Sequence, residues 1–99
     1  MLSLENIIEI GTQVKEIPGH GTEINITKVG INAIDNIKRQ TIRVRVDHFQ
    51  VGQKPTCTRV DGKENEPTRM HPVDSIIQMS ATQYYVFFTN ISLYRVNLT

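Results

Sequence analysis

Two arginines in one short stretch, Arg43 and Arg45, have the type and spacing that suit an anionic ligand. They lie in TIRVRV, residues 41–46, where apolar and polar side chains alternate. Alternate residues of a strand point to the same face and are about 7 Å apart, a spacing that suits two phosphates or one carboxylate. The same pattern is typical of the solvated face of a half-buried strand, with Asp47 as the partner of the arginines. The sequence leaves both interpretations open.

Other basic residues enlarge this candidate site. Two of them lie shortly before the stretch, and a third, in the following polar segment, is expected to lie across the sheet from it. Because these residues form the main concentration of positive charge in the chain, they predict a site for a phosphate-bearing ligand or a nucleic acid. The residues of this predicted site are Lys38, Arg39, Arg43, Arg45 and Arg59.

A nucleic-acid site would also need aromatic faces on which bases can stack. Phe49, Tyr84 and Tyr85 are the candidates for that role. The formal net charge is +1, from 11 basic and 10 acidic residues. Proteins that bind duplexes without sequence preference usually carry a clear basic excess, so the composition argues against that class.

The stretch YYVFFT, residues 84–89, has apolar or aromatic side chains on both faces of a strand. Tyr85 and Phe87 share one face, and Tyr84 and Phe88 share the other. A strand of a lone small domain commonly keeps one side polar. Both sides are therefore covered either within the chain or by another subunit. We expect the second arrangement, a homo-oligomer that uses these four residues as its interface.

Catalytic and metal-binding chemistry have little support. The candidate metal ligands are three histidines and one cysteine. Zinc sites usually combine closely spaced pairs of ligands, whereas these four residues are isolated in sequence. A nucleophilic cysteine needs a neighbouring charge that lowers its pKa, and the single cysteine is followed closely by one arginine only. We therefore predict no catalytic residue, no metal, no cofactor and no enzymatic activity. The isolated candidates are His20, His48, His71 and Cys57.

Most elements are expected to be strands, because isoleucine and valine dominate the apolar residues and β-branched side chains pack well on a pleated sheet. Alternation predicts strands near residues 22–29, 41–49, 73–79, 83–89 and 92–98. Residues 3–11 fit a short helix between Ser3 and Gly11 or a strand, and we expect a strand. Residues 31–39 fit one short helix, because Ile31, Ile34 and Ile37 recur every three residues. They equally fit a hairpin turning at Asp35–Asn36.

Ninety-nine residues are expected to form a single domain, residues 1–99. Residues 52–68 are polar and predict a long loop or a hairpin with a wide tip, with disorder at 62–66. Five to seven short strands predict a mostly β fold, a small antiparallel barrel or sandwich of SH3-like or OB-like size. The alternative is an α+β fold with one packed helix.

The end of the chain, HPVDSIIQMSATQYYVFFTNISLYRV, resembles short β domains of phages and mobile elements. The resemblance assigns no role to any residue. The first residues lack the basic region of a signal peptide, and no apolar run reaches the length of a membrane helix. We therefore expect a cytoplasmic protein, in the host cytoplasm if of phage origin, without membrane contact.

These observations together predict a function class. We expect a non-enzymatic binding or interaction module, a homo-oligomeric accessory protein of phage or mobile-element type. Its partner would be a protein or a phosphate-bearing ligand. The alternative is a β-barrel that binds nucleic acid.

Overall fold

The computed structural model describes residues 4–18, 21–62 and 67–98, and most of them form strands. The prediction of a mostly β fold is confirmed. The described residues form ten strands, more than the five to seven expected, because several strands are only two or three residues long. In chain order the elements are α1 (Leu4–Ile10), β1 (Thr12–Val14), β2 (Glu16–Ile17), β3 (Glu23–Val29), β4 (Ile42–Val46), β5 (Phe49–Gln50), β6 (Thr56–Arg59), β7 (Pro67–Arg69), β8 (Val73–Gln78), β9 (Gln83–Phe88) and β10 (Ser92–Asn97).

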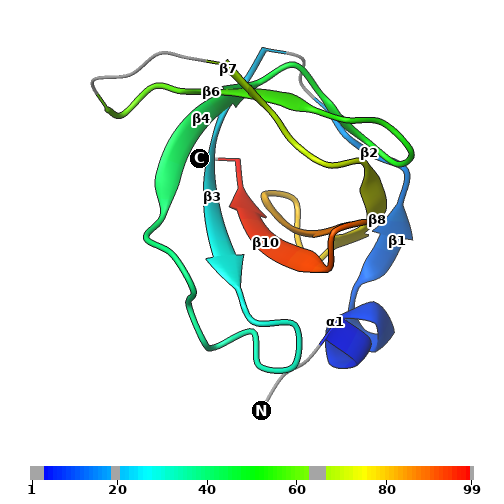
Figure 1. Cartoon of the computed structure of the whole chain (residues 1–99). Coiled ribbons are helices and arrows are strands. Elements are labelled where there is room, and N and C mark those ends of the chain that lie inside the picture. Colours follow the sequence, from blue (N-terminus) through cyan, green and yellow to red (C-terminus); the bar gives the residue numbers. More distant parts are fainter. Residues whose placement is uncertain (1–3, 19–20, 63–66, 99) are drawn as a thin grey trace.

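Eight strands form one antiparallel sheet in the order β1-β8-β9-β10-β3-β4-β6-β7, and β2 pairs with β5 separately. The large sheet curls around its own inner face, as the ribbon in Figure 1 shows. It is not a closed barrel, because β1 and β7 are its two edge strands in the described part of the chain. The fold therefore has the size and curvature of a small barrel without its closure.

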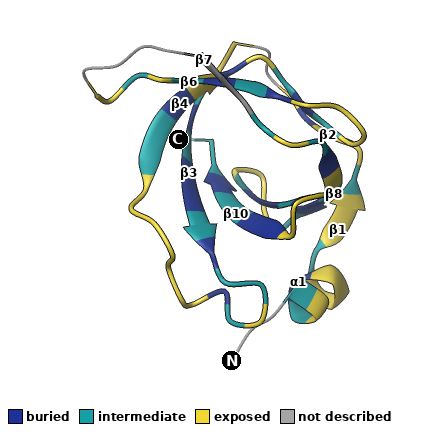
Figure 2. Ribbon diagram, in the orientation of Figure 1, coloured by how far each residue is buried: buried dark blue, intermediate teal, exposed yellow. Residues whose placement is uncertain are grey.

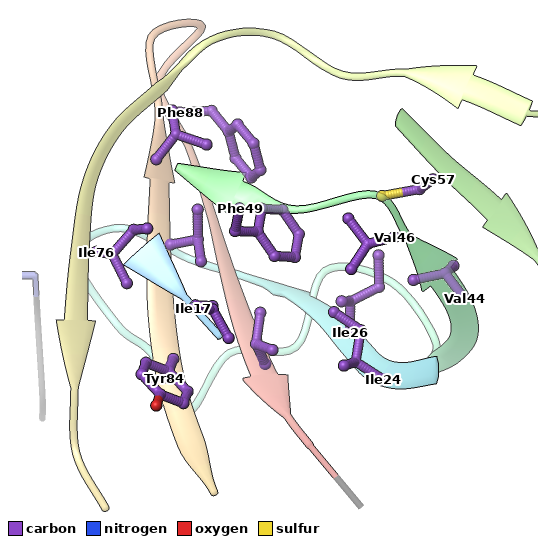
Figure 3. Close-up of a cluster of buried hydrophobic side chains, with 13 residues drawn as sticks. Ile17, Ile24, Ile26, Val44, Val46, Phe49, Cys57, Ile76, Tyr84 and Phe88 are labelled. Atoms are coloured by element: carbon purple, nitrogen blue, oxygen red, sulfur yellow. The ribbon is translucent and has the colours of Figure 1, made fainter. Parts of the chain in front are cut away.

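The main core fills the inner face of the curled sheet. Alternate residues of β3, β4, β9 and β10 point inward, as the sequence pattern predicts, and they meet Phe49 from the small sheet. Figure 3 shows Phe49 among side chains that come from several strands. The buried members of this inner core are Ile17, Ile24, Ile26, Val44, Val46, Phe49, Cys57, Val73, Ile76, Tyr84, Val86, Phe88 and Val96.

A second core lies on the outer face of the same sheet, beneath α1. Ile7 is 0% exposed and belongs to one cluster with Tyr85, Ile77 and Leu93. The strand expected at residues 3–11 was therefore wrong, because the chain forms a helix there. In this helix Ile7 faces the sheet, whereas Ile8 is 46% exposed. Figure 2 shows α1 with exposed residues on its outer side.

Gly11 follows α1 where the chain approaches β8 closely. Its amide donates to the Ile7 carbonyl at 2.8 Å. A Cβ at this position would lie 2.4 Å from Ile77 Cγ2 and 2.9 Å from the Gln78 carbonyl oxygen. The glycine that the sequence offers as a helix stop does end the helix. A side chain would have no room at this position, because the two backbones approach each other closely.

The structure forms no helix at residues 31–39, so that alternative was wrong. The segment turns where the Asn36 amide donates to the Ala33 carbonyl at 2.9 Å. Val29 and Ile37 form an isolated antiparallel bridge, as in the hairpin alternative, although the turn lies one residue earlier than expected. The spacing of the isoleucines was misleading because Ile34 is buried in the outer core, whereas Ile37 is exposed.

The polar segment 52–68 contains a hairpin, since β6 and β7 pair antiparallel. This was one of the two alternatives. Most of the predicted disorder, residues 63–66, lies outside the described residues. The strands expected near residues 73–79, 83–89 and 92–98 are confirmed as β8, β9 and β10, and neighbours in this series pair antiparallel. The turn between β9 and β10 is tight, and Ile91 in it has a φ of 61°.

Candidate ligand-binding cavity

Arg43 and Arg45 lie on the outer face of β4, where one carboxylate pairs with both. Arg43 Nε lies 3.2 Å from Glu23 Oε1, and Arg45 Nη2 lies 3.4 Å from Glu23 Oε2. The register of β3 and β4 explains this arrangement, because Glu23 stands opposite Arg45. The expected partner, Asp47, was therefore wrong. Both arginines keep partial exposure, but part of their charge is already balanced.

Asp47 instead ties the end of β4 to the start of β6. Its Oδ1 accepts hydrogen bonds from the amides of His48 at 2.7 Å and Thr56 at 2.9 Å. Partial burial acts to raise the pKa of this carboxyl, but the two amide donors and the nearby His48 outweigh it. The pKa of Asp47 is consequently lower than its ordinary value.

The five residues of the predicted basic site do not meet at one place. Arg43 and Arg45 are on the outer face, whereas Arg59 stands opposite Val44 in the register of β4 and β6 and shares its inner face. Arg39 also reaches the inner side. Lys38 is exposed, and its backbone amide donates to the Lys28 carbonyl at 2.8 Å.

The inner side contains a cavity of about 500 Å³. Its volume falls within the range of about 300–1,000 Å³ that is usual for small-molecule sites. It lies where β3, β4 and β6 face Tyr94 of β10. Figure 3 shows part of its wall, with Ile26, Val44 and Cys57 near one another. The residues that line the cavity are Ile26, Lys28, Arg39, Gln40, Ile42, Val44, Cys57, Arg59, Met70 and Tyr94.

The cavity wall becomes apolar with depth. Ile26, Val44 and Cys57 are 4%, 2% and 6% exposed, so they form its buried part. Arg39, Gln40 and Arg59 are exposed and Lys28 is half-buried, which places polar groups toward the mouth. The wall therefore combines an apolar interior with a polar, positively charged rim.

Cys57 is part of the apolar wall and has little nucleophilic character. Its Sγ donates a hydrogen bond to Met70 Sδ at 3.3 Å. Burial, assisted by the negative charge of Asp47, raises the pKa of the Cys57 thiol to about 12. The thiol is therefore neutral at physiological pH and is not a reactive thiolate.

Charge at the rim is only partly compensated. Arg59 Nε donates to Asp61 Oδ1 at 2.7 Å. Neither Lys28 nor Arg39 has an ion-pair partner within residues 4–18, 21–62 and 67–98. Asp61 also accepts from the Arg43 amide at 2.9 Å, and the Arg59 and Arg43 donors lower the pKa of Asp61. Two uncompensated cations thus border an apolar cavity.

The four aromatic residues expected at a subunit interface lie in the two cores of this chain. Tyr84 and Phe88 are in the inner core, and Tyr85 is buried in the outer core with Phe87 partly buried against it. Both faces of β9 are thus covered within the chain, which is the arrangement we did not expect. The homo-oligomer itself stays a prediction.

Cys57, His48 and His71 are the candidate metal ligands that the structure describes. His48 lies beside Asp47, with Nδ1 3.9 Å from Asp47 Oδ2, and His20 lies outside the described residues. Among the residues that the structure describes, no three His, Cys, Asp or Glu side chains gather closely enough to hold a metal ion.

Lys28, Met70 and Tyr94 line the cavity but were not predicted from the sequence as site residues. A signal for Lys28 was present, because alternation places it on the same face of its strand as Ile24 and Ile26. A lysine at a core-facing position indicates either a pocket or a strand end. The contributions of Met70 and Tyr94 depend on which strands are neighbours, which local patterns do not reveal.

Compared with known proteins, the chain matches no protein-family model and no solved structure. Within its described residues, the chain has no helix of the length and apolar character needed to span a membrane. The cavity and its charges are therefore the features from which a function can be inferred.

Proposed function

We propose that this domain is a non-enzymatic binding module that holds a small anionic ligand in the cavity of its inner face. One observation carries the proposal: Lys28, Arg39 and Arg59 border a single cavity with an apolar wall. Charges beside an apolar wall act in a medium of lower dielectric constant, so each attracts an anion more strongly than it would in bulk water. A phosphate-bearing ligand, expected from the sequence, matches this chemistry.

Several parts of the proposal come from the sequence. The absence of a predicted nucleophile or acid–base pair, together with the high pKa of Cys57, supports a role in binding instead of catalysis. A homo-oligomeric accessory protein of phage or mobile-element type, acting in the cytoplasm, remains our expectation for its wider context. Nucleic-acid binding through Arg43 and Arg45 has less support, because Glu23 pairs with both arginines.

The test is a titration with inorganic pyrophosphate followed by NMR chemical shifts of the backbone amides. We expect saturable shifts around Lys28, Arg39 and Arg59. The double variant Lys28→Gln/Arg39→Gln should weaken the affinity about tenfold or more, because charge-assisted hydrogen bonds are lost.

The matched control is Arg43→Gln/Arg45→Gln, which removes two cations from the outer face and should leave the affinity unchanged. If the control variant loses binding and the cavity variant keeps it, the ligand site is the outer face and the proposal is wrong. The absence of any saturable shift in the wild-type protein would also contradict it.

A further inference from the structure

The polarity of the cavity changes from its buried part to its mouth, and this gradient limits the kind of ligand. The deep wall consists of Ile26, Val44 and Cys57, and the cations stand at the more exposed positions. We propose that the ligand is a small phosphomonoester with an alkyl or aryl body, which lies tail inward with its phosphate at the mouth. This inference rests on the proposed function, since it specifies the anion that the same cavity holds.

The charges at the mouth favour a phosphomonoester over a singly charged anion. Lys28 and Arg39 have no ion-pair partner among the described residues. Arg59 uses Nε for Asp61, and its terminal nitrogens donate to no other described residue. Gln40 supplies a neutral amide at the same rim. A phosphomonoester carries a charge of about −1.5 to −2 at neutral pH, with a second pKa of about 6, which matches two uncompensated cations.

The deep wall favours an apolar body over a sugar. A hydroxyl buried against Ile26 and Val44 would find no hydrogen-bond partner there and would lose its bonds to water. Ile42, Met70 and Tyr94 continue the apolar surface toward the mouth. Tyr94 makes an edge-to-face contact with Phe88, whose ring centroid lies 5.4 Å away. Cys57 adds no negative charge, since its thiol is protonated at neutral pH.

The first experiment compares phosphate alone with a homologous series of alkyl phosphates. Isothermal titration calorimetry with inorganic phosphate and with ethyl, butyl and hexyl phosphate measures how affinity depends on chain length. We expect each added methylene to tighten binding by up to about fourfold until the tail fills the cavity, because a buried methylene contributes about 0.8 kcal/mol. An affinity that does not depend on chain length would overturn the inference.

The second experiment tests the head group and the wall separately. Hexyl phosphate should bind at least tenfold more tightly than heptanoate at neutral pH, and this advantage should shrink as the pH falls through about 6, where the phosphate gains a proton. Met70→Gln replaces an apolar lining residue of the cavity and should reduce the gain per methylene. Lys38→Gln is the control, since it removes an exposed lysine outside the cavity lining. Equal binding of heptanoate and hexyl phosphate would contradict a dianionic head group.

The failure of this inference can be distinguished from the failure of the proposed function. If inorganic phosphate or pyrophosphate binds at Lys28 and Arg39 without any gain from an alkyl tail, the anion-binding function stands and the amphiphilic ligand is wrong. If no anion binds, both proposals fail. Sedimentation with vesicles that contain phosphatidic acid, without binding of soluble hexyl phosphate, would show a membrane lipid as the ligand and overturn the soluble phosphomonoester.

Discussion

At the scale of single residues, two aspartates secure the segments beside the cavity. Asp47 accepts amide hydrogen bonds from His48 and Thr56, and Asp61 joins the Arg59 guanidinium to the Arg43 amide. Both pKa values are lower than usual in the folded protein. Each ionised carboxylate therefore stabilises the folded state, and protonation removes that contribution.

We predict that the free energy of unfolding is higher at neutral pH and decreases as the medium becomes acidic. An unfolded aspartate has a pKa of about 3.9. The contributions of Asp47 and Asp61 are complete above that value and are lost as the pH falls through their lower folded-state pKa values. Urea denaturation at a series of pH values measures the effect. Asp47→Asn should lower stability at neutral pH and make its decrease between about pH 5 and pH 2 less steep.

The control for this prediction is Asp74→Asn, which changes an exposed aspartate whose side chain makes no hydrogen bond to the described residues. Its pH profile should follow that of the wild-type protein. If Asp47→Asn and Asp74→Asn gave identical profiles, the hydrogen bonds of Asp47 would not be the cause of the acid dependence.

At the scale of elements, α1 acts as the cover of the outer core. Ile7 is completely buried beneath the helix, whereas its neighbour Ile8 is 46% exposed. We predict that Ile7→Ala lowers the free energy of unfolding by about 2–4 kcal/mol, because it removes buried methyl groups and leaves a cavity. Ile8→Ala has the same chemistry at an exposed position and should cost less than about 1 kcal/mol. Denaturant unfolding of the two variants measures the difference.

This pair also tests the assignment of the first segment. If residues 4–10 formed a strand, Ile8 and Ile10 would lie on one face and Ile7 on the other. Equal destabilisation by Ile7→Ala and Ile8→Ala would therefore argue against the helix and its orientation. A larger effect of Ile7→Ala than of Ile8→Ala is the expected outcome for a helix that packs on the sheet.

At the scale of the whole molecule, the state of association is open to a direct measurement. The sequence predicts a homo-oligomer because β9 has two apolar faces, but both faces are covered within one chain. A homo-oligomer would therefore need another surface, such as the exposed Ile8 and Ile10 of α1. Size-exclusion chromatography with light scattering should then give a multiple of the 11.3 kDa chain mass, and Ile8→Ser/Ile10→Ser should reduce it to one chain. A monomeric wild-type protein would contradict the prediction.

Much of this fold could be predicted from local patterns. The strands over residues 23–29, 42–46, 73–78, 83–88 and 92–97 follow from alternation, because side chains of a strand point to opposite faces in turn. The same period correctly predicts that Val44 and Val46 are buried on the face opposite Arg43 and Arg45. The first helix could not be predicted in this way, because seven residues with three isoleucines fit a helical face and a strand face equally well.

The sequence by itself determined the β class, the inward faces of the main strands and the net charge of +1. Only the tertiary structure decided which cations share a site. Arg59 lies on the inner face because it stands opposite Val44 in the register of β4 and β6, and a slip of one residue would turn it to the outer face. Register depends on contacts between segments that are distant in the chain. The cavity bordered by Lys28, Arg39 and Arg59 is therefore a property of the folded sheet, which no short stretch of the sequence contains.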